Sequence, residues 1–176
     1  LGQLDAAVKS YEKALVFKPS LAEVHNNLGN AYKKLGQLDT AVQSYEKALA
    51  IKPEFIGAYN NLGNALKERG DLDAAVKSYE KALLLKPDYA EAHYNLGNAF
   101  KELGQLDAAV KHYKKTLIIN SDNVEALSNL GGVLKELGQL DAAVKSYEQA
   151  LAIKPDFADA HNNLGVALEQ LKEFDL

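Results

Sequence analysis

The chain has 176 residues and contains no cysteine, no methionine and no tryptophan. Without cysteine it has no disulfide framework, no thiolate nucleophile and no sulfur-ligated metal site. Long apolar runs are also missing, since no stretch approaches the roughly 20 residues that a membrane-spanning helix needs. The first residues lack the charged and then apolar order of a signal peptide. We therefore expect no membrane partner, and we expect a cytoplasmic location.

An excess of positive charge is absent as well. The formal net charge is -4, which creates no overall field that attracts phosphate backbones, so no nucleic acid partner is expected. With 47% hydrophobic and 25% charged residues the chain has the composition of a folded protein and not of a disordered one. Because it has no initiator methionine and begins at Leu1 within a repeated pattern, we expect a piece of a longer protein.

A period of 34 residues runs through the sequence. The phrase GQLDAAVKSYE begins at Gly2 and returns at Gly138, with near copies at Gly36, Gly70 and Gly104. Further columns keep the same register: Gly29, Gly63, Gly97, Gly131 and Gly165; Tyr11, Tyr45, Tyr79, Tyr113 and Tyr147; Pro19, Pro53, Pro87 and Pro155. So many aligned columns indicate a repeat protein.

Each period predicts two amphipathic helices. Apolar residues from Val24 to Leu35 recur at steps of three and four, and a second stripe runs from Leu38 to Leu49. Lys52-Pro53 should end the second helix, because proline disfavours the helical conformation at the preceding residue. The glycine and alanine columns should let two helices approach closely, and the tyrosines should fill the space between neighbouring hairpins.

Residue types at the helix ends support these boundaries. Asp5, Asp73, Asp107 and Asp141 lie where second helices should begin. Capping boxes are predicted from Ser20 to Glu23, from Asp88 to Glu91 and from Asp122 to Glu125. Lys172 stands where a glycine would close the last hairpin.

A single hairpin cannot bury both of its apolar stripes, so the hairpins should stack into a solenoid. We predict one solenoid over residues 1–176. It would contain a lone second helix in 1–21, complete repeats at 22–55, 56–89, 90–123 and 124–157, and a lone first helix in 158–176.

The columns represented by Leu62-Gly63, Ala75, Tyr79, Ala82 and Pro87 resemble the tetratricopeptide repeat (TPR) family over essentially the whole chain. The resemblance implies an all-α fold, a right-handed α-solenoid of antiparallel helical hairpins, and a role in protein binding. Thr116 in an alanine column, Ser121 in the proline column and Leu127 in a histidine or tyrosine column depart from the pattern and affect only local geometry.

Asparagines recur on the polar side of the first helices. One column holds Asn27, Asn61, Asn95, Asn129 and Asn163, and a second holds Asn30, Asn64 and Asn98 before it ends at Gly132 and Val166. The TPR resemblance implies that first helices line a concave groove. Because an asparagine amide can bond the C=O and N–H of an extended peptide, we predict that these eight residues form a peptide-binding ladder. The alternative is that they are surface residues with local hydrogen bonds.

The array is similar to the asparagine-lined superhelix of O-linked N-acetylglucosamine transferases, so the chain could be the substrate-recruiting arm of a larger enzyme. A carboxylate clamp of the TPR type is disfavoured because Glu23, Glu91 and Glu125 stand beside the asparagines. The basic row of Lys33, Lys67, Lys101 and Lys135 is offset by Glu68, Glu102 and Glu136, which favours a solvated face.

No motif predicts catalysis, a metal or another cofactor. His25, His93 and His161 share one column and should lie too far apart to hold a metal. His112 lies alone on a second helix beside Tyr113 and is expected to be a satisfied or an exposed histidine. Ser10, Ser78 and Ser146 have no suitable base nearby. A last alternative is end-to-end self-association, in which the first helix at the C-terminus pairs with the apolar stripe of Leu4, Val8, Tyr11 and Leu15 in a second copy.

Overall fold

A computed structural model describes residues 2–174, in which every element is an α-helix. The helices in chain order are α1 (Gly2–Phe17), α2 (Ala22–Lys34), α3 (Leu38–Ile51), α4 (Ile56–Arg69), α5 (Leu72–Leu85), α6 (Ala90–Glu102), α7 (Leu106–Ile119), α8 (Val124–Glu136), α9 (Leu140–Ile153) and α10 (Ala158–Phe174). The all-α prediction is confirmed, and the helix pairs α2–α3, α4–α5, α6–α7 and α8–α9 fall within the predicted repeats.

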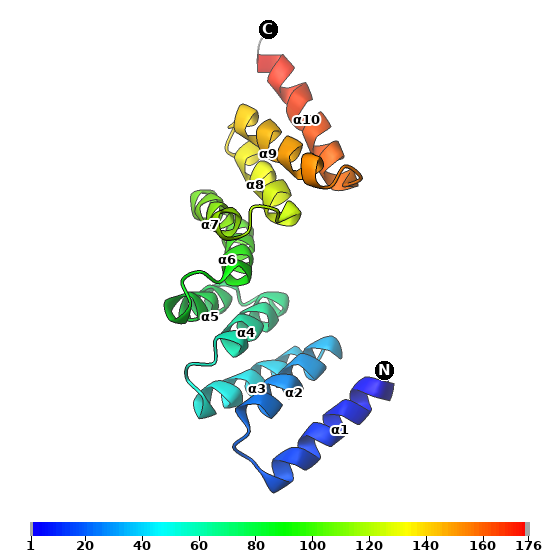
Figure 1. Cartoon of the computed structure of the whole chain (residues 1–176), viewed down its shortest axis with the longest axis vertical. Helices are drawn as coiled ribbons and strands as arrows, with labels where there is room; N and C mark the ends of the chain where they lie inside the picture. Colours follow the sequence, from blue (N-terminus) through cyan, green and yellow to red (C-terminus); the bar gives the residue numbers. More distant parts are fainter. Residues whose placement is uncertain (1, 175–176) are drawn as a thin grey trace. The chain divides into compact units, whose positions relative to one another are not determined.

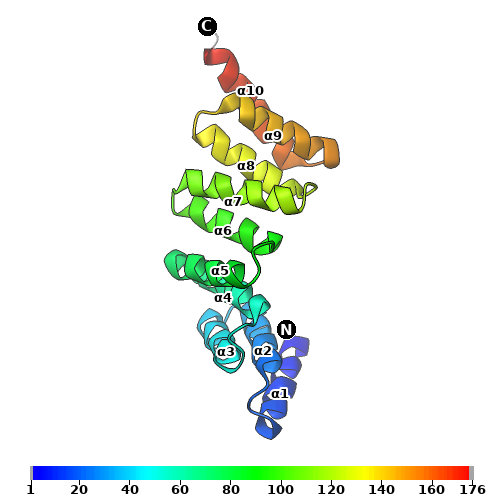
Figure 2. The same cartoon turned by 60° about the vertical axis from the view of Figure 1, so that its left-hand side comes forward.

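The chain divides into two compact units, Leu1–Pro87 and Asp88–Leu176. In the first unit α1 packs against α2, the hairpin α2–α3 follows, and α3 packs against the hairpin α4–α5 (Figure 1). In the second unit the hairpin α6–α7 packs through α7 against α8, and α9 packs against α10, as a second view also shows (Figure 2). Each unit is a stack of hairpins, while a single solenoid over residues 1–176 stays a prediction.

Glycine closes the hairpins as predicted. Gly36, Gly70, Gly104 and Gly138 have φ angles of 75°, 95°, 71° and 72°, a left-handed conformation that costs glycine nothing. At position 172 the glycine is replaced by lysine, and α10 continues to Phe174.

The second helices end without depending on proline. Lys52 is extended, with φ -133° and ψ 86°, as expected for a residue before proline. Asn120 has nearly the same conformation, with φ -137° and ψ 92°, although Ser121 follows it. In both cases the backbone N–H bonds the carbonyl four residues earlier, Ala48 O at 2.9 Å and Thr116 O at 2.8 Å. The helix end is therefore set by the packing of the repeat, and proline only favours it.

The predicted capping boxes are wrong by one residue. The N-cap residues are Leu21, Tyr89 and Asn123, each one position after the predicted Ser20, Asp88 and Asp122. Neither Leu21 nor Tyr89 makes a side-chain cap, whereas Asn123 Oδ1 accepts from the Ala126 amide at 2.7 Å. An apolar or aromatic residue occupies two of these three caps, so these two helices begin without the bond that a polar cap would supply.

The core is built from tyrosines that lie over glycines. Tyr45, Tyr79, Tyr113 and Tyr147 are completely buried, and the alanines of both predicted columns that flank them are buried too. A Cβ built on Gly131 would come within 2.7 Å of Tyr147 Cε1, and one built on Gly97 within 2.8 Å of Tyr113 Cε1. The predicted reason for the glycine column, close approach between two helices, is confirmed. The tyrosines were expected between neighbouring hairpins, whereas each of these rings lies over a glycine of its own hairpin.

Candidate functional site

The predicted peptide-binding asparagines all lie on first helices. Asn27, Asn30, Asn61 and Asn64 belong to α2 and α4 of the first unit, and Asn95, Asn98, Asn129 and Asn163 belong to α6, α8 and α10 of the second. Asn27 is exposed and the other seven are half-buried. Each unit therefore presents its own part of the two columns.

The asparagines of the second column form hydrogen bonds with the core tyrosines. Asn30, Asn64 and Asn98 each accept a hydrogen bond at 2.7 Å, from the hydroxyls of Tyr45, Tyr79 and Tyr113 respectively. Burial raises the pKa of Tyr45 and Tyr113, so these hydroxyls keep their protons and act as donors. The amide oxygen of this column thus has a structural partner within its own hairpin, which sequence reasoning did not find.

The first column links consecutive first helices. Asn61 Nδ2 donates to Asn26 Oδ1 at 3.0 Å, across 35 residues of sequence. Asn129 Nδ2 donates to Tyr94 Oη at 3.1 Å and to Asn98 Oδ1 at 3.0 Å. Asn26 and Tyr94 occupy the column next to the ladder, and they were not among the predicted site residues. The 34-residue repeat could have identified both residues, because each lies one position before the ladder column and so beside the ladder asparagine of the following repeat.

A polar pocket of about 370 Å³ opens in the second unit on the side of these first helices. It is lined by Tyr94 of α6, by Glu125, Ser128 and Asn129 of α8, and by Phe157, Asp159, Asn162 and Asn163 at the start of α10. Two predicted residues, Asn129 and Asn163, are brought together there. Amides, hydroxyls and carboxylates converge with two aromatic rings, a lining that suits a polar, extended ligand.

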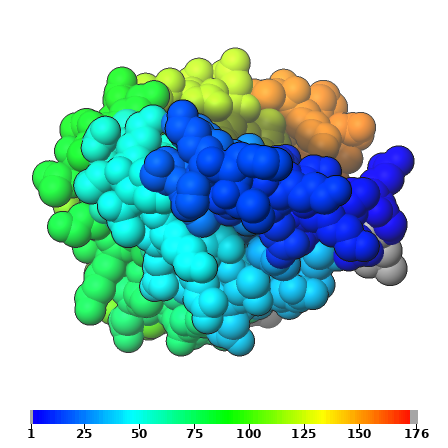
Figure 3. Space-filling model, turned by 90° about the horizontal axis from the view of Figure 1, so that it is seen from below, coloured from blue at the N-terminus to red at the C-terminus, as the bar shows by residue number. Residues whose placement is uncertain are grey.

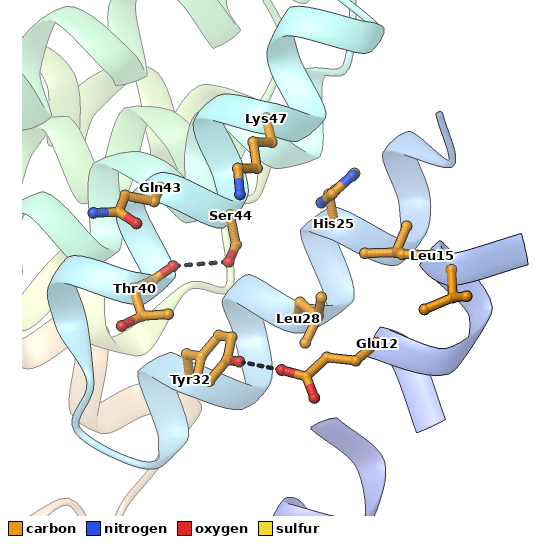
Figure 4. A pocket seen from close by; sticks show the side chains of 10 residues that line it. Glu12, Leu15, His25, Leu28, Tyr32, Thr40, Gln43, Ser44 and Lys47 are labelled. Carbon is orange, nitrogen blue, oxygen red and sulfur yellow. Dashed lines mark hydrogen bonds between the residues drawn. The ribbon is translucent and has the colours of Figure 1, made fainter. Parts of the chain in front are cut away.

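Another pocket, of about 360 Å³, lies between α1, α2 and α3 of the first unit (Figure 4). His25 and Leu28 of α2 face it, with Glu12 and Leu15 from α1. The Tyr32 hydroxyl donates to Glu12 Oε1 at 3.0 Å and so joins α2 to α1. The eight predicted asparagines do not line this pocket.

His112 was expected to be a satisfied or an exposed histidine, and the structure shows a satisfied one whose partner the sequence did not identify. Its Nδ1 lies 3.0 Å from Nδ1 of His93, which is 8% exposed, so one ring donates and the other accepts a hydrogen bond. Burial first, and then the charges of His93 and Lys111, lower the pKa of His112 to about 4. Sequence reasoning placed His93 only within its own column, whereas the α6–α7 hairpin brings the two helices together. Among residues 2–174 no group of three or more His, Asp or Glu could hold a metal.

Charges on the first helices are partly paired. Lys33 Nζ lies 2.7 Å from Glu68 Oε1 and joins α2 to α4, in agreement with the predicted cancellation of the basic and acidic rows. Glu23 lies 3.1 Å from Lys52, and hydrogen bonds to backbone and to Lys52 lower the pKa of the Glu23 carboxyl. No helix in the described part of the chain is long and apolar enough to span a membrane.

The repeat geometry can be compared with known proteins. Residues 1–36, 29–68, 63–104, 97–138 and 133–172 each match the TPR repeat family. The chain belongs to this family. TPR proteins are in general non-catalytic scaffolds for protein interactions, and no enzyme family matches the chain. A comparison with curated proteins gave no match.

Solved TPR structures resemble the chain closely. The structure of MamA is 30% identical, covers 89% of this chain and 92% of its own, and gives a TM-score of 0.84. YrrB, described as a TPR protein with an unusual peptide-binding site, is 25% identical over 94% of this chain and 85% of its own, with a TM-score of 0.80. TTC0263, a thermophilic TPR protein of Thermus thermophilus, is 30% identical over 96% and 92%, with a TM-score of 0.72.

Proposed function

We propose that this TPR chain binds an extended segment of a partner protein on the polar side of its first helices. The observation that carries the proposal is the pocket between α6, α8 and α10, where Asn129 and Asn163 from successive repeats face the same space as Tyr94. YrrB, a TPR protein of similar structure, has a peptide-binding site, which supports the same class of ligand here.

The spacing of the asparagines suits such a ligand. Packed helices lie about 8 to 10 Å apart, and an extended peptide advances about 3.3 Å per residue. Successive rungs would therefore meet about every third peptide residue. An asparagine bonds the peptide backbone in the way a neighbouring strand does, so the groove would accept varied side chains.

The internal hydrogen bonds limit which atoms can contact a ligand. Asn98 Oδ1 is held by Tyr113 and Asn129, so its amide nitrogen is the group left for a peptide carbonyl. Asn129 has both amide donors directed at the protein, so its carbonyl oxygen would accept from a peptide N–H. The ladder would then offer alternating donors and acceptors along the groove.

A peptide selection tests this function. A random-sequence phage-displayed peptide library is panned on the 176-residue chain, and the enriched peptides are synthesised and titrated calorimetrically. The double variant Asn129→Ala/Asn163→Ala should weaken binding about thirtyfold or more, since it removes two polar contacts worth about 1 kcal/mol or more each. Gln149→Ala removes an exposed amide from the second helix α9 and should leave the affinity unchanged. Equal weakening by both changes, or no enrichment at all, would rule the function out.

Self-association is a second candidate, and the open face of α10 favours it. A Cβ on Gly165 would meet nothing within 4 Å, whereas a tyrosine ring covers Gly29, Gly63, Gly97 and Gly131. Tyr11 of α1 belongs to the tyrosine column and is only half-buried, and the outer side of α1, in dark blue, is uncovered at its end of the first unit (Figure 3). Tyr11 of a second copy would fit over Gly165.

Sedimentation velocity tests this candidate. The sedimentation coefficient should increase with protein concentration, and Gly165→Leu should abolish this increase. A monomer at all concentrations would contradict self-association.

If the chain is the recruiting arm of a larger enzyme, as the resemblance drawn from the asparagine columns implies, the bound segment would be a substrate. Any sequence that flanks these repeats would decide this point, because a catalytic domain would be recognisable in it.

A further inference from the structure

In the α6–α7 hairpin one oxygen receives two hydrogen bonds. Asn98 Oδ1 accepts from the Tyr113 hydroxyl at 2.7 Å and from Asn129 Nδ2 of the next repeat at 3.0 Å. The oxygen therefore satisfies a buried donor of its own hairpin and a donor of the following first helix.

One period later the two donors remain and the acceptor is gone. Position 132 is glycine where Asn98 and its equivalents stand, while Tyr147 and Asn163 repeat Tyr113 and Asn129. Tyr147 is 0% exposed, and its hydroxyl is the buried side-chain group among residues 2–174 for which no hydrogen-bond partner exists. Asn163, which repeats the second donor, lines the pocket next to Asn129.

Buried hydroxyls without an acceptor are rare, because a hydroxyl that gives up water must regain a hydrogen bond. The hydroxyl has almost no exposed surface, and beside it Gly132 leaves space for a further atom, since a Cβ built there would lie 3.8 Å from Tyr147 Oη and meet no other atom within 4 Å. Gly132 is partly exposed and follows two lining residues of the pocket, Ser128 and Asn129, by one helical turn, whereas Gly132 and Tyr147 are not lining residues themselves.

We propose that a peptide carbonyl oxygen of the bound partner takes the position that the asparagine oxygen has in earlier repeats, beside Gly132, and accepts hydrogen bonds from Tyr147 Oη and Asn163 Nδ2. The proposal rests on the proposed function and names the anchor point of its ligand. The chemistry of the replaced group, an amide carbonyl, fixes the class of acceptor. A carboxylate is disfavoured because Glu125 and Asp159 line the pocket and none of its lining residues is basic.

Burial raises the pKa of Tyr147 to about 12, so at neutral pH the hydroxyl is a donor to such a carbonyl. The remaining pocket residues, with Tyr94 and Phe157 as flat apolar walls, would hold the residues on either side of that carbonyl.

The test uses peptides enriched by the same phage selection, titrated against Gly132→Asn, Gly132→Ala and Tyr147→Phe in the full chain. Gly132→Asn restores the internal acceptor and should weaken binding at least about tenfold, and Tyr147→Phe should weaken it about tenfold through the lost bond. Gly132→Ala also adds a Cβ to the helix but no acceptor, so Gly132→Asn should bind the peptides at least about tenfold more weakly than Gly132→Ala does.

A second measurement needs no ligand. Thermal unfolding should show a higher Tm for Gly132→Asn than for Gly132→Ala, although alanine has the better helix propensity, because only asparagine can accept from Tyr147. The proposed anchor at Tyr147 is refuted if the Tm of Gly132→Asn does not exceed that of Gly132→Ala. It is also refuted if Gly132→Asn and Tyr147→Phe keep wild-type affinity while Asn129→Ala/Asn163→Ala loses affinity. In either case the proposed function itself stands. If the double asparagine variant also binds normally, or no peptide is enriched, the proposed function and the anchor fail together.

Discussion

The glycines of the tyrosine-facing column should respond in opposite ways to the same substitution. Gly131 lies under Tyr147, and a Cβ there would come within 2.7 Å of Cε1 and 2.8 Å of Cζ. Gly165 occupies the same place in α10, where a Cβ would meet nothing within 4 Å. The two positions share a unit, a repeat column and a helical backbone, so they differ only in what covers them.

Replacing glycine by alanine inside a helix stabilises the folded state by about 0.5–1 kcal/mol, because alanine loses less backbone entropy. Gly165→Ala should gain this amount. At Gly131 the same gain is opposed, because the completely buried ring of Tyr147 must move by roughly 1 Å to reach ordinary contact, and overpacking of this kind costs about 1–3 kcal/mol. Gly131→Ala should therefore be neutral or destabilising by up to about 2 kcal/mol.

Urea unfolding followed by far-UV circular dichroism measures both variants, at a protein concentration low enough to suppress association. Hydrogen exchange of the α10 backbone amides measures how far Gly165→Ala stabilises that helix locally. The expected result is a difference of about 1–3 kcal/mol between the two variants, with the midpoint raised for Gly165→Ala and unchanged or lowered for Gly131→Ala. Two equal stabilisations would refute the reasoning, because they would show that the tyrosine ring adjusts to a methyl group without cost.

Three further outcomes follow from the contacts of single residues. Tyr79→Phe should cost about 1 kcal/mol in urea unfolding, because it leaves Asn64 Oδ1 without its donor, while Tyr147→Phe should be neutral or stabilising in the unliganded chain. Gly36→Ala should destabilise by about 1 kcal/mol or more in the same assay, because its φ of 75° is strained for any residue with a Cβ. The folded-state pKa of His112 is lowered to about 4, so the unfolded chain binds more protons and stability should fall as the pH drops from about 6.5 towards 4. His112→Ser, which introduces the residue of the other repeats, should lose part of this pH dependence, and an unchanged slope would contradict the assigned pKa.

The sequence alone was sufficient for the helices and for the joints between them. The 34-residue period and the two apolar stripes within it predicted both helices of each repeat. The glycines that close the hairpins could be identified because the left-handed conformation favours glycine. These features depend on residues that are neighbours in sequence or recur at a fixed period. The predicted capping boxes were displaced, because the N-caps of three first helices lie one residue after the polar residue that has the spacing of a cap.

The site was predicted only in part. The sequence placed the asparagines on first helices, and their number and register followed directly from the repeat. It did not reveal that Asn98 shares its oxygen between Tyr113 and Asn129, nor that His93 meets His112. Those bonds join residues that lie on different helices.

The sequence by itself therefore determined the repeat, the two helices of each repeat and the repeat column to which each side chain belongs. These features follow from local periodicity and from backbone conformational preference. Only the tertiary structure decided which polar atoms are already satisfied by a neighbouring helix and which, like the hydroxyl of Tyr147, are left with none. The physical reason is that a hydrogen bond requires its donor and acceptor atoms to lie within about 3 Å of each other. The position of a residue in the 34-residue repeat does not fix its side-chain atoms to that precision.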